Sequence, residues 1–114
     1  MAFTEIELAR IKKAVGWLCD RRNRPDLKSE LSLEYRVNGH DVTVFERRPR
    51  WDGSPGHTEG PVAKLKFVRG TGQWRLLWHR ADLKWHAYGP LPSSTDLSEL
   101  VAEIDEDPSA CFFG

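Results

Sequence analysis

Residues 31–48 read LSLEYRVNGHDVTVFERR, and this stretch decides the fold. Residues 31–37 and 41–48 are rich in Val, Leu, Tyr and Phe, the side chains that favour strands. Asn38-Gly39 lies between them and is the strongest short signal for a hairpin, typical of a type I′ turn. The stretch therefore predicts two neighbouring antiparallel strands.

The register of this hairpin follows from its turn. With Asn38-Gly39 as a two-residue loop, Tyr35 pairs with Val42, and side chains alternate between two faces. One face then holds Leu33, Tyr35, Val37, Val42 and Val44. The other face holds Ser32, Glu34, Arg36, Asp41, Thr43 and Phe45.

Three more segments have strand composition, namely residues 62–69, 74–80 and 83–88. Gly70-Thr71-Gly72 separates the first two and Ala81-Asp82 the last two, and such short connections force antiparallel neighbours. The stretch Arg50–Gly60 contains three glycines and a proline and predicts a loop. The sequence thus predicts a five-stranded antiparallel meander.

Amphipathic helices are predicted on both sides of the strands. The first runs from Thr4 to about Arg22, where Thr4 and Glu7 match a capping box. Its apolar stripe comprises Leu8, Ile11, Val15 and Leu18. The second covers about residues 96–106, with Asp96 as its cap. This order predicts an α+β domain with an N-terminal helix, the sheet and a C-terminal helix, both helices on one sheet face.

The 114 residues suit a single domain spanning 1–114. No run of about 20 apolar residues is present, so we expect no membrane span, and the first residues lack the features of a secretory signal. Cys19 and Cys111 lie at opposite ends of the chain. We expect free thiols in a reducing compartment, the cytoplasm, with a disulfide between the two as the alternative.

Charge is unevenly distributed although the formal net charge is zero. Residues 21–90 hold fourteen basic and eight acidic side chains, whereas residues 91–114 hold six acidic side chains and no Lys or Arg. Such asymmetry marks a partner surface or an acidic tail. The alternative is that the acidic segment lies against the basic middle of the same chain.

Strand parity also predicts which side chains share a face in the last three strands. With Thr71-Gly72 and Ala81-Asp82 as two-residue loops, Trp78 pairs with Trp85 across two strands. The predicted core face comprises Ala63, Leu65, Phe67, Trp74, Leu76, Trp78, Leu83, Trp85 and Ala87. The predicted basic face comprises Lys64, Lys66, Val68, Arg75, Leu77, His79, Lys84, His86 and Tyr88. A one-residue slip in either turn would scramble this assignment.

The basic face is the strongest candidate for a functional surface. Lys and Arg on an open sheet suit a phosphate backbone, and Tyr88 is available for base stacking, so we expect a nucleic acid or another anionic ligand. A second candidate patch consists of Arg47, Arg48, Arg50 and Trp51, next to Asp52, since arginine binds phosphate or carboxylate and Trp anchors a partner. The alternative is that Arg48 forms an ion pair with Glu46 on the same strand face. A solvated face is the structural alternative for the whole sheet.

Two other functions stay open. The chain is a small enzyme or metabolite-binding protein if its cationic side chains surround a pocket for an anionic ligand, the candidates being Arg48, Arg50, Arg75, His79 and His86. It is a structural partner of another protein if the acidic helix is the contact. The apolar tail Ala110–Phe113 either completes the core or docks on a second subunit, which would form a homodimer.

Motifs for catalysis and cofactors are lacking. No G-x-S-x-G elbow or P-loop occurs, and His79 with His86 gives fewer than the three ligands a zinc site requires. We therefore expect a binding module rather than an enzyme, with no catalytic residue, metal or cofactor.

Long stretches of the strand region resemble a known family. They are Gly39-His40-Asp41-Val42-Thr43-Val44-Phe45-Glu46, Arg48-Pro49-Arg50-Trp51, Pro61-Val62-Ala63-Lys64, Trp74-Arg75-Leu76 and Arg80-Ala81-Asp82-Leu83-Lys84-Trp85. With most of residues 30–105, they resemble a small bacterial family described as domain of unknown function 3024. The resemblance implies a bacterial single-domain protein and no particular activity.

Overall fold

The computed structural model describes residues 3–23, 31–50 and 52–113. Its first helix, α1 (Glu5–Arg22), begins with the predicted capping box. The Thr4 hydroxyl accepts a hydrogen bond from the Glu7 N–H at 3.2 Å, and the Thr4 N–H donates to the Glu7 carboxylate at 2.9 Å. The prediction for Leu8 is wrong, since this side chain is 42% exposed. Phe3 fills this end of the core instead, stacked on Trp74 at 5.5 Å between ring centroids.

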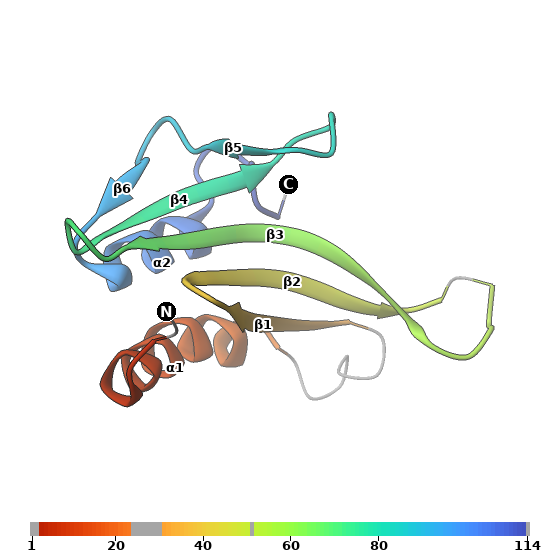
Figure 1. The fold of residues 1–114 in the computed structure, drawn as a ribbon. Helices are drawn as coiled ribbons and strands as arrows, with labels where there is room; N and C mark the ends of the chain where they lie inside the picture. Colours follow the sequence, from red (N-terminus) through yellow and green to blue (C-terminus); the bar gives the residue numbers. More distant parts are fainter. Residues whose placement is uncertain (1–2, 24–30, 51, 114) are drawn as a thin grey trace.

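A six-stranded antiparallel sheet follows α1 (Figure 1). Its strands are β1 (Ser32–Asn38), β2 (Asp41–Pro49), β3 (His57–Val68), β4 (Gln73–His79), β5 (Trp85–Ala87) and β6 (Ser93–Ser94). β1 to β5 are neighbours in chain order, which confirms the predicted meander. β6 is the strand that the sequence did not indicate. It pairs with β4 at Trp74 and Arg75, on the same edge as β5.

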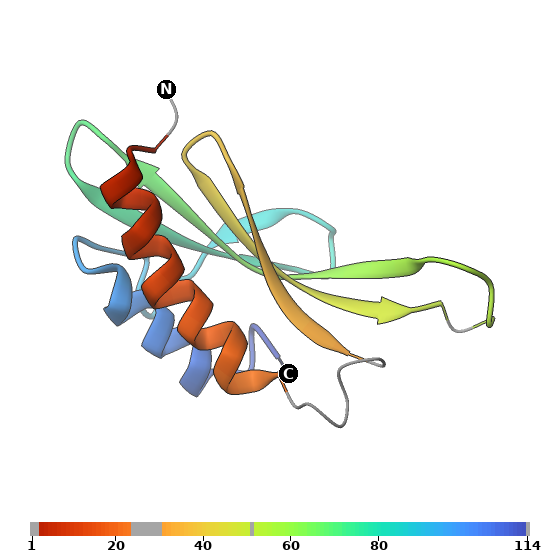
Figure 2. The ribbon, with the colours of Figure 1, turned by 90° about the horizontal axis from the view of Figure 1, so that it is seen from below.

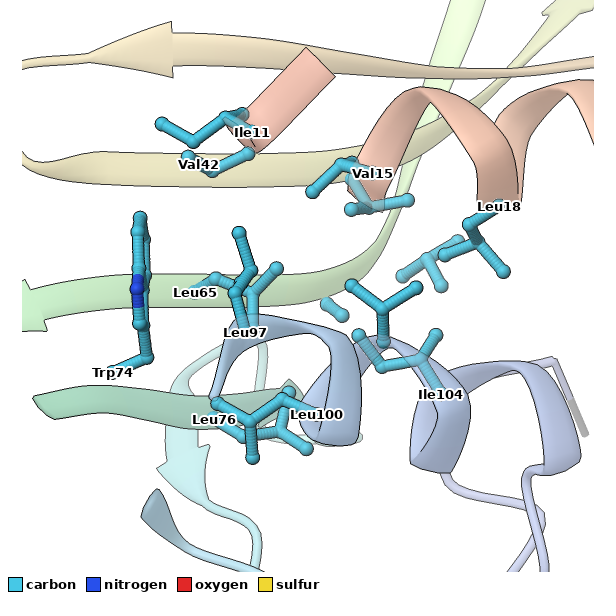
Figure 3. Packing of buried hydrophobic residues seen from close by; sticks show 14 of the residues in the cluster. Ile11, Val15, Leu18, Val42, Leu65, Trp74, Leu76, Leu97, Leu100 and Ile104 are labelled. Atoms are coloured by element: carbon cyan, nitrogen blue, oxygen red, sulfur yellow. The ribbon is translucent and has the colours of Figure 1, made fainter. Parts of the chain in front are cut away.

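Both helices cover one face of the sheet, as predicted. α2 (Leu97–Glu106) is capped by Asp96 and lies beside α1 (Figure 2). Many of the side chains packed between helices and sheet are at most 2% exposed, among them Ile11, Val15, Leu18, Val42, Val44, Leu65, Leu76, Leu100, Val101 and Ile104 (Figure 3). Each such side chain contributes about 1.5–3 kcal/mol through burial, which makes this layer the main source of stability.

β2 and β3 extend past the helices as a two-stranded arm, visible in Figure 2. β3 begins at His57, within the segment predicted as a loop, and pairs with β2 alone until Ala63. Pro61 is tolerated there because no described strand pairs with this part of β3 on its other side. Gly53 and Gly56 take positive φ angles of 76° and 104° in the connection at the tip.

A β-bulge marks the root of the arm. The β2–β3 register shifts between Val44, which pairs with Ala63, and Phe45, which pairs with Pro61. The extra residue, Val62, is buried together with Ala63 on the helix side. A bulge of this kind lets two consecutive side chains enter one core, which regular alternation forbids.

In two hairpins the side chains lie on the predicted faces of the sheet, but the cross-strand residue pairs differ from the predicted ones. The turn between β1 and β2 is Gly39-His40, and Gly39 alone has positive φ, the pattern of a type II′ turn. Tyr35 therefore pairs with Val44 rather than Val42. In the β3–β4 hairpin, Leu65 pairs with Leu76 across a four-residue loop. Both registers differ from prediction by two residues, so every side chain keeps its predicted face.

The β4–β5 hairpin contradicts the prediction. Its turn has three residues, with Leu83 at φ 64°, and it pairs Trp78 with His86 and His79 with Trp85. The resulting one-residue shift reverses every side chain of β5. Trp85 leaves the predicted core face, and the predicted Trp78–Trp85 pair does not form. Leu83 is 79% exposed rather than buried.

The C-terminal segment folds back onto the core. Asp107 ends α2 in a left-handed conformation, and its carboxylate accepts hydrogen bonds from the N–H groups of Phe112 and Phe113 at 3.0 and 2.9 Å. Phe112 is buried, so the tail completes the core of its own chain. Asp105 of the acidic segment 91–114 forms an ion pair with Arg21 of the basic segment 21–90. This is one contact of the kind expected if the two segments lie against each other.

Cys19 is buried and Cys111 half-buried, and both are free thiols, as predicted. Burial raises the pKa of the Cys19 thiol to about 11. Among the described residues, no helix has the length and apolar character needed to cross a membrane.

Candidate anion-binding surface on the sheet

The sheet face opposite the helices carries four of the predicted site residues. We call it the open face and define it by Glu34, Arg36, Asp41, Thr43, Phe45, Lys64, Lys66, Arg75, Leu77, His79 and Trp85. Lys64 and Lys66 come from β3, and Arg75 and His79 come from β4. They share this face because each is offset by an odd number of residues from the buried side chains Leu65 and Leu76.

Three cations form the centre of the open face. Lys66 pairs directly with Arg75, and Lys64 lies two residues before Lys66 on β3. Among the described side chains, no carboxylate lies within 4 Å of these three charged groups. Asp41 pairs with Lys66 along the backbone without an ion pair. Like charges directly opposite each other destabilise a sheet, so the Lys66–Arg75 pair has a local energetic cost, which Asp41 on the other side of Lys66 offsets in part.

Other charges of this surface are already compensated. Arg36 bonds Glu59 at 2.8 and 3.2 Å, and this hydrogen bond lowers the pKa of Glu59. The guanidinium of Arg36 also lies 4.7 Å from the ring centroid of Phe45, which is buried beneath it. Arg47 lies 3.7 Å from Glu34. The excess positive charge is therefore concentrated on β3 and β4.

An aromatic pair lies beside these cations. The rings of His79 and Trp85 meet edge to face at 5.0 Å, and the Lys64 ammonium lies 5.1 Å from the Trp85 ring centroid. Trp85 is half-buried, so part of its ring is accessible. Sequence reasoning missed Trp85 because it assumed a two-residue turn. A three-residue turn, often found with a left-handed last residue, would have identified it.

The remaining residues of the predicted basic face lie elsewhere. Tyr88 is fully buried, with its ring 4.9 Å from Phe112, so it is unavailable for base stacking. His86 faces the helix side, and its Nε2 lies 2.8 Å from a carboxylate oxygen of Asp82, a contact that lowers the pKa of Asp82. Lys84 directly follows the β4–β5 turn, where its carbonyl accepts a hydrogen bond from the Arg80 N–H at 3.1 Å. The one-residue shift of β5 explains all three differences.

The predicted arginine patch is on the arm. Arg48 bonds Glu46 at 2.7 Å, as the alternative proposed, although Arg48 itself is exposed. Arg50 is exposed at the end of β2, and Trp51 lies outside the described residues. The cationic pocket considered for a metabolite is not assembled from the predicted side chains, because Arg75 and His79 lie on the open face while His86 faces the helix side.

Within residues 3–23, 31–50 and 52–113, no three His, Cys, Asp or Glu side chains lie close enough together to hold a metal ion. The open face therefore offers cations, hydrogen-bond donors and an aromatic ring. This set binds anions and stacks on planar groups.

The comparisons with known proteins give a family and no activity. Neither the curated proteins nor the solved structures contain a match. One family model, described as a domain of unknown function, matches residues 3–114, which is nearly the whole chain. The chain therefore belongs to the family DUF3024.

Proposed function

We propose that this protein binds an anionic polymer, a nucleic acid, through its open face. The observation that carries the proposal is the Lys66–Arg75 cross-strand pair, joined by Lys64 and without a described carboxylate in ion-pair distance. A bound phosphate backbone would remove the repulsion within this pair. It would also release counterions, which is the main electrostatic source of affinity for nucleic acids.

The dimensions of a sheet support this role. Residues two apart on a strand are about 6.6 Å apart and neighbouring strands about 4.8 Å, so the three cations form a compact group that one run of phosphates can contact. Trp85 and His79 lie next to this group and offer a surface for an unpaired base. An open sheet with basic and aromatic side chains suits a single strand, whose bases are free to stack.

The proposal includes a cellular location. Two free thiols support a reducing compartment, and the resemblance seen in the sequence supports a bacterial origin. We therefore propose the bacterial cytoplasm.

Fluorescence anisotropy across a salt series tests the proposal with random-sequence single- and double-stranded DNA and RNA. We expect log affinity to fall linearly with log salt. The triple variant Lys64→Gln, Lys66→Gln, Arg75→Gln should bind weakly, with a slope reduced by about 2 for a single strand, because each lost phosphate contact removes about 0.7.

A matched control is available on α1. The triple variant Arg10→Gln, Lys12→Gln, Lys13→Gln also removes one arginine and two lysines, but from the opposite side of the molecule. It should retain affinity and slope. Equal loss in both triple variants would mean that only net charge matters, and absence of binding at low salt would refute the proposal.

A further inference from the structure

A cleft of about 800 Å³ lies between the two helices, on the side of the molecule away from the open face. Its lining includes Arg10, Lys13, Ala14, Trp17, Trp74 and Val101. The lining comes from α1 as far as Trp17, from α2 with the residues just before it, and from the β3–β4 hairpin. Its volume is within the range of small-molecule sites, about 300–1,000 Å³.

The cleft follows from how the helices are joined. They lie side by side (Figure 2), and ion pairs from Arg21 and Arg22 to Asp105 connect their C-terminal ends. Leu18 and Ile104 fill the space between these ends. Toward the N-terminal ends, Ala14 and Ala102 are too small to fill the corresponding space, and the cleft opens there.

Apolar and aromatic side chains make up much of the wall. Trp74, Leu97 and Val101 belong to the core and form the base of the cleft, with Phe67 partly buried beside them. Trp17 stands at the edge with 49% of its surface exposed. An exposed tryptophan beside an apolar base is a common feature of binding sites, since its large ring adds contact area at a small entropic cost.

The acidic and basic side chains of the cleft differ in whether they have bonding partners in the fold. Glu7 accepts two hydrogen bonds from Arg69, at 2.8 and 3.1 Å, and Asp96 accepts the Ser98 N–H at 2.9 Å. Arg10 and Lys13, one turn apart on α1, have no carboxylate within 4 Å among the described residues. Both carboxylates thus have bonding partners in the fold, whereas the two cations stand free at the edge of an apolar cleft.

We infer that this cleft binds a small organic acid with an apolar body, its carboxylate at Arg10 and Lys13 and its body against Trp17, Trp74 and Val101. The two cations supply charge complementarity, and the aromatic base excludes water from the apolar part of the ligand. This site is independent of the open face, and neither proposal requires the other.

The probe for the test is 1-naphthaleneacetate. Its binding to the full chain is monitored by NMR through the indole N–H signals of the tryptophans. We expect saturable shifts of the Trp17 and Trp74 signals and none of the Trp85 signal, which lies on the open face. The uncharged analogue 1-naphthaleneacetamide should bind about tenfold more weakly, the loss that two partly exposed charge contacts produce.

Variants separate the charge from the cavity. The double variant Arg10→Gln, Lys13→Gln should lower the affinity for 1-naphthaleneacetate by a similar factor. Lys12 is an exposed neighbour that does not line the cleft, so Lys12→Gln should leave the affinity unchanged. Ala102→Trp, at an exposed helix position, should abolish binding with the helical circular dichroism intact. Equal affinity for acid and amide, or binding that survives Ala102→Trp, would overturn the inference. The open-face triple variant should bind the acid normally, so that failure of one proposal leaves the other testable.

Discussion

Glu7 connects two parts of the molecule that are 62 residues apart in sequence. Its carboxylate accepts the Thr4 N–H at the start of α1 and two bonds from Arg69 in the β3–β4 loop. The bond from Arg69, followed by the bond from the Thr4 backbone, lowers the pKa of Glu7 from 4.5 to about 2. The sequence predicted the capping bonds, since they are local, but Arg69 comes close only through the tertiary fold.

This carboxylate should make stability depend on pH in a defined window. Its folded pKa is below its unfolded pKa, so the stabilisation is complete above pH 4.5 and is lost as pH falls toward 2. Glu7→Gln keeps an oxygen for the Thr4 N–H and removes the charge.

In urea unfolding, the wild type should have a larger free energy of unfolding than Glu7→Gln, by an amount that is constant from pH 7 to 5 and shrinks below pH 4.5. The matched change Glu5→Gln, in the same exposed first turn, should show no such window, and an advantage that persists unchanged near pH 2 would contradict the assignment.

At the scale of elements, the helices and the faces of four strands could be predicted from the sequence. Capping residues and apolar spacing are local signals, and a register error of two residues preserves faces because side chains alternate with a period of two. The same rule explains the failure at β5, where an error of one residue reversed the strand. The start of β3 could not be predicted either, because Gly60-Pro61 is typical of a loop and is tolerated here only where β3 lacks a second neighbour.

Leu83 is the reason that the β4–β5 turn escaped prediction. The last position of this three-residue turn has φ 64°, a conformation that glycine adopts freely and leucine does not. The side chain is 79% exposed, so it contributes little packing in return. Leu83→Gly should therefore raise the free energy of unfolding by about 0.5–1 kcal/mol, measured by urea denaturation.

Leu83→Ala is the control for the loss of the side chain. Alanine keeps a Cβ and with it the strain of positive φ, so this variant should be close to wild type. A stabilisation as large as that of Leu83→Gly would show that removal of an exposed leucine, and not the backbone angle, is responsible.

At the scale of the whole molecule, part of the candidate site could be predicted. Lys64, Lys66 and Arg75 lie together because parity in the β3–β4 hairpin was correct. The cleft could not be predicted, since it depends on the separation of two helices about 80 residues apart in the chain, and no local pattern determines that separation. Tyr88, predicted at the surface, instead connects three distant parts of the fold.

The role of Tyr88 provides a test of the architecture as a whole. Its backbone N–H donates to Leu76 of β4, its hydroxyl donates to Glu103 of α2 at 2.8 Å, and its ring packs on Phe112 of the C-terminal segment. Tyr88→Phe removes the hydroxyl and with it the bond to Glu103, and a lost hydrogen bond to a charged group costs about 1.5–3 kcal/mol. We expect the free energy of unfolding in urea to decrease by this amount. Nucleic-acid affinity in the anisotropy assay should be unchanged because Tyr88 is remote from the open face.

Tyr35→Phe, the same change at the other tyrosine, removes a hydroxyl that bonds to no described side chain and should have a smaller effect. If Tyr88→Phe lowered nucleic-acid affinity without lowering stability, Tyr88 would have to belong to the binding surface, and the register of β5 that excludes it would be wrong.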